Sequence, residues 1–101
     1  MRYVIGRMWV RAGTRADLLK ECTSYVASSR ADRGCIYFHI VPMVDEADGV
    51  VMIECWETEA DHKSHQASDY AKAFGPVAGQ YLVRGDFQEM NVEKAEQVSF
   101  G

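Results

Sequence analysis

Apolar and polar residues alternate along four short stretches of the chain, and this period of two is typical of β-strands. The four predicted strands cover residues 3–11, 35–43, 50–57 and 85–92. In the first strand Val4, Met8 and Val10 share one face, while Tyr3 and Ile5 share the other. The second and third strands are apolar on both faces, so the pattern predicts a sheet with apolar residues on both of its sides.

A helical spacing of apolar residues follows the first strand. Thr14, with Asp17 three positions later, is a plausible N-cap for this helix, and Gly34 suits a left-handed residue at its end. The stripe that would face a core comprises Leu18, Leu19, Cys22, Tyr25, Val26 and Ser29.

The same capping pattern recurs after the third strand. Thr58 with Asp61 predicts the start of a second helix, which runs to about Phe74. The pair at 75–76 is Gly-Pro, which predicts a break there, followed by a short further helical turn over residues 76–83.

The order of elements is therefore β-α-β-β-α-β, which is the order of the ferredoxin-like fold. The expected fold is α+β, with a four-stranded antiparallel sheet and two helices on one face. Pro42 near the end of the second strand suits an edge position, where its missing N–H is harmless. Two helices cover only one face of the sheet, so the apolar residues on the other face predict a two-fold dimer that packs sheet against sheet.

Length and composition limit the remaining choices. With 101 residues there is room for one domain, 1–101, with a core of about 3–92 and a polar tail, 93–101. A net charge of -4 argues against nucleic acid or an anionic membrane as a partner. Residues 1–10 lack the layout of a signal peptide, and no apolar run is long enough to span a bilayer. Three widely spaced cysteines favour reduced thiols and a cytoplasmic location: Cys22, Cys35 and Cys55.

Residues 50–65 carry the densest group of side chains capable of chemistry. Glu54 and Trp56 lie two apart on a strand and so share a face, while His62 and His65 lie three apart on the next helix. A pure core would have aliphatic residues at these positions. A structural ion pair for Glu54 and a core position for Trp56 are the plainer interpretations, and a metal site at His-x-x-His with Asp61 or Glu54 lacks a fixed third ligand.

Together these residues resemble the antibiotic biosynthesis monooxygenase family, a group of dimeric α+β barrel proteins. The resemblance rests on the Glu-x-Trp strand, the capped turn, and the helix that carries histidine and the step Ser68-Asp69-Tyr70 before Phe74. The Gly34-Cys35 entry to the second strand fits the same pattern. The match extends over about residues 3–92.

The resemblance implies a cofactor-independent monooxygenase that uses O₂ and a small aromatic or quinol substrate. A deprotonated phenol reduces O₂ itself, so the protein needs a dry aromatic pocket and a base rather than a flavin or a metal. The expected catalytic residues are His65 as the base, with Glu54 and Trp56. The expected substrate-binding residues are His39, His62, Tyr70 and Phe74.

The resemblance raises two other functions, of which the residues present disfavour the first. Haem-degrading members carry a tryptophan where His65 lies and a histidine about ten residues later, near Gly75, and both are absent here. A non-catalytic dimeric protein that binds a small apolar molecule would need the same pocket, so it stays open as the alternative.

Overall fold

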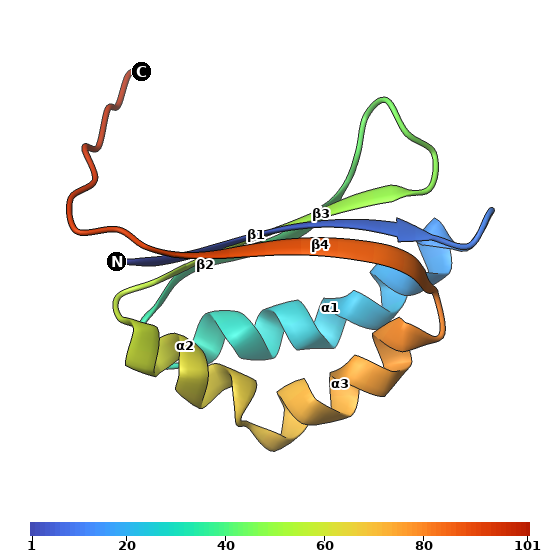
Figure 1. The fold of residues 1–101 in the computed structure, drawn as a ribbon, viewed down its shortest axis with the longest axis horizontal. Coiled ribbons are helices and arrows are strands. Elements are labelled where there is room, and N and C mark those ends of the chain that lie inside the picture. The colour runs from blue at the N-terminus through green and yellow to red at the C-terminus, as the bar shows by residue number, and fades with distance from the viewer.

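The computed structural model describes residues 1–101 as one antiparallel sheet with all helices on a single face (Figure 1). The strands are β1 (Arg2–Val10), β2 (Cys35–Pro42), β3 (Gly49–Trp56) and β4 (Leu82–Asn91). The helices are α1 (Arg15–Ala31), α2 (Glu59–Gln66) and α3 (Asp69–Gly79). The strand order is β2-β3-β1-β4, which confirms the predicted ferredoxin-like fold.

The predicted strands are confirmed. Successive side chains of a strand point to opposite faces of the sheet, so the alternating pattern determines which residues face the helices. Val4, Met8 and Val10 are buried against the helices, whereas Ile5 lies on the opposite face. β2 is an edge strand, as Pro42 predicted. No helix of the chain is long and apolar enough to cross a bilayer.

The first helix forms where its apolar stripe predicted. Leu18, Cys22 and Ser29 are buried against the sheet. Thr14 occupies the N-cap position, but its hydroxyl donates to the carbonyl of Arg11 at 2.7 Å instead of capping a helical N–H. Gly34 has φ +80°, and a Cβ there would overlap the Asp61 carboxylate, so both backbone conformation and space require glycine.

The prediction for the second helix placed its end at the wrong residue. The helix that Thr58 caps, with its hydroxyl accepting from the N–H of Asp61 at 3.0 Å, ends at Gln66 rather than near Phe74. Ser68 then starts α3, because its hydroxyl accepts from the N–H of Ala71. α3 runs through Pro76 without a break and ends at Gly79, so the helical turn predicted over 76–83 is the end of this helix, and β4 begins at Leu82. The chain therefore has three helices, not two.

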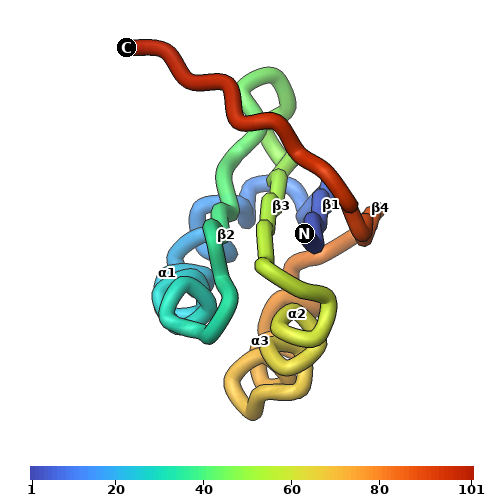
Figure 2. The backbone as a smooth tube through the Cα atoms, turned by 90° about the vertical axis from the view of Figure 1, so that its left-hand side faces the viewer, coloured from blue at the N-terminus to red at the C-terminus, as the bar shows by residue number.

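The space between sheet and helices has two different halves. One half is a plain apolar core of Met8, Val10, Leu18, Cys22 and Val50. The other half, around the start of β1 and the end of β3, buries aromatic and polar side chains together: Arg2, Phe38, Glu54, Trp56, His62 and His65. Figure 2 shows α1 under the β2 edge and α2 and α3 further toward β4.

The opposite face of the sheet has no cover within the chain (Figure 1). Ile5, Tyr37 and Val41 on this face are 42%, 37% and 43% exposed. The expectation of apolar residues on both faces of the sheet is therefore confirmed, while the dimer inferred from it stays a prediction.

Candidate functional site

A cavity of about 320 Å³ lies between the sheet and the helices, next to the polar half of the interior. It brings together side chains from β1, β3, β4, α1 and α2. Its lining comprises Val4, Tyr25, Met52, Glu54, His62, His65, Gln66, Phe87 and Glu89. Apolar and aromatic surface with a few polar groups is the usual composition of a small-molecule site.

The sheet side of this cavity is formed by the ring of Phe87 lying over two glycines. A Cβ on Gly6 would stand 2.7 Å from this ring, and one on Gly85 would stand 2.8 Å from it. Phe87 is half exposed. Glycine at both positions therefore allows an aromatic wall to lie flat against the strands.

Glu54 is the buried carboxyl group of the cavity. It is 3% exposed and accepts a hydrogen bond from Trp56 Nε1 at 2.9 Å. Burial raises the pKa of Glu54 from 4.5 to about 7, against the opposing effect of the Trp56 hydrogen bond. A carboxyl group with this pKa exchanges its proton at neutral pH, as a general acid or base must.

His62 is held in one tautomer by Arg2. The Nε–H group of Arg2 donates to His62 Nδ1 at 3.1 Å, and a guanidinium has no acceptor, so Nδ1 must be unprotonated. Burial lowers the pKa of His62, in agreement with a neutral ring. The ring proton is therefore on Nε2, which lies 3.7 Å from Glu54 Oε1. His62 presents a hydrogen-bond donor on the Glu54 side of the cavity.

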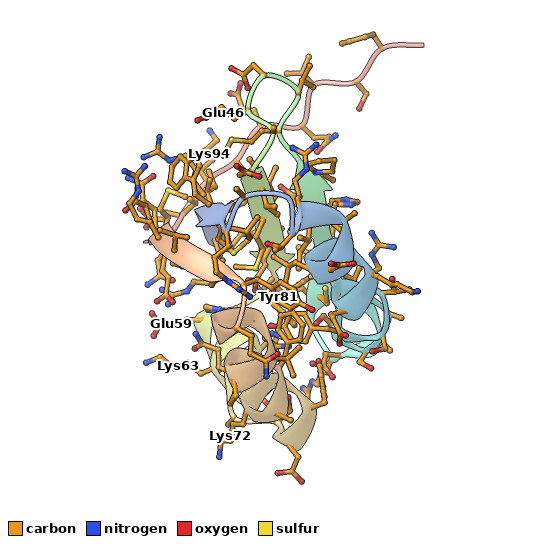
Figure 3. The ribbon with its side chains drawn as sticks, turned by 90° about the vertical axis from the view of Figure 1, so that its right-hand side faces the viewer. Glu46, Glu59, Lys63, Lys72, Tyr81 and Lys94 are labelled. Atoms are coloured by element: carbon orange, nitrogen blue, oxygen red, sulfur yellow. The ribbon has the colours of Figure 1, made fainter.

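Arg2 also joins three elements through its remaining N–H groups. It contacts Glu59 at 3.0 Å on α2, and Glu89 at 2.8 Å and Asn91 at 3.2 Å on β4. Glu59 pairs in turn with Lys63 at 3.5 Å on the outer side of α2 (Figure 3). Four of the five N–H groups of the guanidinium are thus engaged, and the wall of the cavity is fixed on this side.

His65 lies on the opposite side and is held by α1 and the turn that follows it. Its Nδ1 is 3.0 Å from Asp32 Oδ2 and 3.0 Å from the Tyr70 hydroxyl, and its Nε2 is 3.2 Å from the Tyr25 hydroxyl. The Tyr70 hydroxyl also donates to Asp32. Burial raises the pKa of Tyr25, and it raises the pKa of Tyr70 to about 12. Both phenols are therefore neutral donors near pH 7.

A second, polar pocket of about 650 Å³ adjoins the other side of His65. Asp32 and Ser68 line it, together with residues from the start of α2. His65 borders both spaces and is itself buried. The imidazole therefore forms part of the wall between an inner aromatic cavity and an outer polar pocket.

A sequence model described as "Antibiotic biosynthesis monooxygenase" matches residues 1–76, which include both histidines of the site. The chain belongs to the antibiotic biosynthesis monooxygenase family. A Bacillus subtilis protein named "Putative monooxygenase YcnE" is 29% identical over 87 residues, which cover 86% of this chain and 90% of the relative. The word monooxygenase stands in both names, and neither name specifies a substrate.

Solved structures show the same fold. A "putative antibiotic biosynthesis monooxygenase" from Deinococcus radiodurans has a TM-score of 0.89 at 13% identity, covering 99% of this chain and 100% of its own. Rv0793 from Mycobacterium tuberculosis has a TM-score of 0.84 at 18% identity, covering 95% of this chain and 98% of its own. At these identities the likeness shows the family's architecture alone.

The structure brings together three of the residues expected from the family resemblance and places the others outside the cavity. Glu54, His62 and His65 line it. Trp56 is completely buried behind Glu54 and holds it through the indole N–H. Tyr70 reaches the site through Asp32 and His65 instead of lining the cavity.

The last two expected residues lie elsewhere. Phe74 stacks on the ring of Tyr25 with centroids 4.0 Å apart, and it packs against the apolar core. His39 is on the uncovered face of the sheet, where its Nδ1 contacts Arg30 at 3.1 Å. The period of two along β2 explains this, because Phe38 points to the helices and its neighbour must point away.

Among the residues of the site that sequence reasoning missed are Arg2, Tyr25 and Asp32. Arg2 falls just before the first predicted strand, and Asp32 lies two positions before Gly34, where the first helix was expected to end. Tyr25 belonged to the predicted core stripe, and its hydroxyl was the one signal for a further role, since a buried tyrosine usually needs a hydrogen-bond partner.

The His-x-x-His alternative gains no third ligand in the structure. Nowhere in the chain do three or more histidine, cysteine, aspartate or glutamate side chains gather closely enough to hold a metal ion. Both imidazoles are instead engaged, His62 with Arg2 and His65 with Asp32.

Proposed function

We propose that this protein is a cofactor-independent monooxygenase that oxidises a small aromatic, quinol-type substrate with O₂. The observation that carries the proposal is the cavity beneath Phe87, where apolar surface meets Glu54, His62 and His65. Membership of the family and the name of the Bacillus subtilis relative support it.

The chemistry needs a proton acceptor and a means of stabilising negative charge. His65 serves as the base that takes the substrate's hydroxyl proton. The anion and the oxygen adduct formed from it give four electrons to O₂ in all. One oxygen atom bonds to a ring carbon, and the other leaves as water with the two hydrogens that the substrate loses, one from its hydroxyl group and one from that ring carbon. The neutral Nε2–H of His62 is aimed to stabilise the anion, and Glu54 exchanges a proton beside it. Trp56 positions Glu54.

Oxygen uptake by the purified protein tests this proposal. The protein is first dialysed against a chelator and shown by absorbance to contain no flavin or haem, then supplied with a panel of hydroquinones and anthrols. We expect uptake that is lost in His65→Ala and kept in His39→Gln, a change of the histidine that lies outside the cavity. Absence of uptake across the whole panel would contradict the proposal.

A binding protein without catalysis is the second candidate. It is favoured by one observation: every buried polar side-chain atom already has a hydrogen-bond partner within the chain, including the His65 nitrogen proposed as base. Thermal stabilisation by a quinol, with neither oxygen uptake nor product, would support this function over the first.

Either function is proposed for a homodimer. The uncovered face carries Ile5, Tyr37 and Val41, and the central strand adds Val51 and Ile53. Leaving about 500 Å² of such surface in water costs on the order of 12 kcal/mol relative to burial, before association entropy is subtracted. A second copy presenting the same face would bury it.

A further inference from the structure

A short series of hydrogen-bonded side chains connects the inner cavity with the outer pocket. Tyr25 lines the cavity, His65 lies between the two spaces, and Asp32 lines the outer pocket. The contacts are 3.2 Å from the Tyr25 hydroxyl to His65 Nε2 and 3.0 Å from His65 Nδ1 to Asp32. All three come from different parts of the chain, α1, α2 and the turn before β2.

The partners determine where the protons lie. A carboxylate accepts but does not donate, so the proton of neutral His65 is on Nδ1 and points to Asp32. His65 Nε2 is then an acceptor, and the Tyr25 hydroxyl donates to it. His65 thus has the opposite tautomer to His62, which carries its proton on Nε2 because of Arg2. The site holds one imidazole as a donor and the other as a base.

This arrangement engages the acceptor nitrogen of the base with Tyr25. Both residues border the cavity, but His65 is buried with its Nε2 occupied by the phenol, whereas Tyr25 is half-buried beside the space where a ligand would lie. The Tyr25 ring is itself fixed, stacked on Phe74 and edge-on to Phe38. A rotation of the hydroxyl hydrogen is the only movement that the tyrosine needs in order to exchange partners.

We propose that Tyr25 is the catalytic residue that contacts the substrate hydroxyl, that His65 acts through it, and that Asp32 is the positioning residue that stabilises the charged imidazole. The inference rests on the proposed function and names the path of its proton. The substrate O–H bond breaks and its proton binds Tyr25 Oη, while the proton of Tyr25 passes to His65 Nε2. The products are a substrate anion, neutral Tyr25 and an imidazolium paired with Asp32. The same path returns the proton to the oxygen atom that leaves as water.

The first test follows the proton without turnover. The ring nitrogens of the three histidines are recorded by ¹⁵N NMR under nitrogen, before and after addition of 1,4-dihydroxynaphthalene. In the free wild-type protein we expect His65 as the Nδ1–H tautomer. Binding should convert part of it to imidazolium. This conversion should be lost in Tyr25→Phe and fall several-fold in Asp32→Asn.

A matched control separates the relay from a general effect of removing a phenol. Tyr81 precedes β4 and packs against the apolar core away from His65, so Tyr81→Phe should respond like the wild type. An Nε2–H tautomer in free His65, or an undiminished response in Tyr25→Phe, would overturn the relay.

The second test measures the rate. General acid–base catalysis contributes roughly a hundredfold or more, so Tyr25→Phe should lower kcat by about that factor with a smaller change in KM. A kcat equal to that of the wild type would refute the role of Tyr25. Failure of the proposed function is distinguishable, because it appears as no oxygen uptake by the wild-type protein itself.

Discussion

Replacing Glu54 by glutamine should make the protein more stable at alkaline pH, although it changes a residue of the candidate site. The pKa of Glu54 is raised by burial from 4.5 to about 7. Between these two values the unfolded chain releases the proton while the folded chain keeps it. The raised pKa therefore lowers the stability of the wild type as pH rises from 4.5 to 7, and the loss is complete above pH 7.

The magnitude follows from the size of the shift. One pKa unit corresponds to about 1.4 kcal/mol, so the wild type loses on the order of 3 kcal/mol of unfolding free energy across this range. The glutamine side chain of the variant does not ionise, and its carbonyl oxygen still accepts from the Trp56 indole. The gain in unfolding free energy on Glu54→Gln should rise from near zero at pH 4 to about 3 kcal/mol at pH 8.

Urea unfolding, followed by tryptophan fluorescence at one protein concentration, measures this difference at each pH. Glu59→Gln is the matched control with the opposite sign. The hydrogen bond from Asn91 lowers the pKa of Glu59, so this variant should lose stability at neutral pH and less of it in acid. A gain for Glu54→Gln that does not change with pH, or that is larger in acid, would refute the reasoning.

Three further outcomes are expected. Arg2→Met leaves His62 Nδ1 without its donor and removes the ion pairs to Glu59 and Glu89, so it should cost about 2 kcal/mol in urea unfolding and release the His62 tautomer in ¹⁵N NMR. Gly6→Ala should displace the Phe87 ring into the cavity and weaken quinol binding by titration; unchanged affinity would contradict the role of the glycine. Light scattering should give about twice the 11.4 kDa chain mass, and Ile53→Lys on the uncovered face should give a single chain mass.

The strands and their faces were predictable because a period of two is a local property of the sequence. It correctly placed Glu54 and Trp56 on one face of β3. The position of the helix break could not be predicted from the sequence, because two local signals competed. Gly75-Pro76 is a known breaker, but Ser68 caps a new helix earlier, and α3 continues through Pro76 at the loss of one backbone donor.

The site was predictable only where its members are neighbours along the chain. His62 and His65 lie one helical turn apart, and their rings are 6.5 Å apart in the structure. Tyr25 and Asp32 reach His65 across 40 and 33 positions of sequence, and no local pattern encodes that contact. His39 illustrates the converse, since a chemically suitable residue lies on the wrong face of its strand.

Helix α2 is so short that it depends on contacts of the site in order to stay folded. Its eight residues are too few for a stable isolated helix, and the only buried residues on it are His62 and His65. The contacts of the two imidazoles with Arg2 and Asp32 therefore hold the helix on the sheet. Amide hydrogen exchange in α2 is thus coupled to the formation of the site, and the side chains proposed to act on a substrate form one cooperative unit with the backbone that carries them.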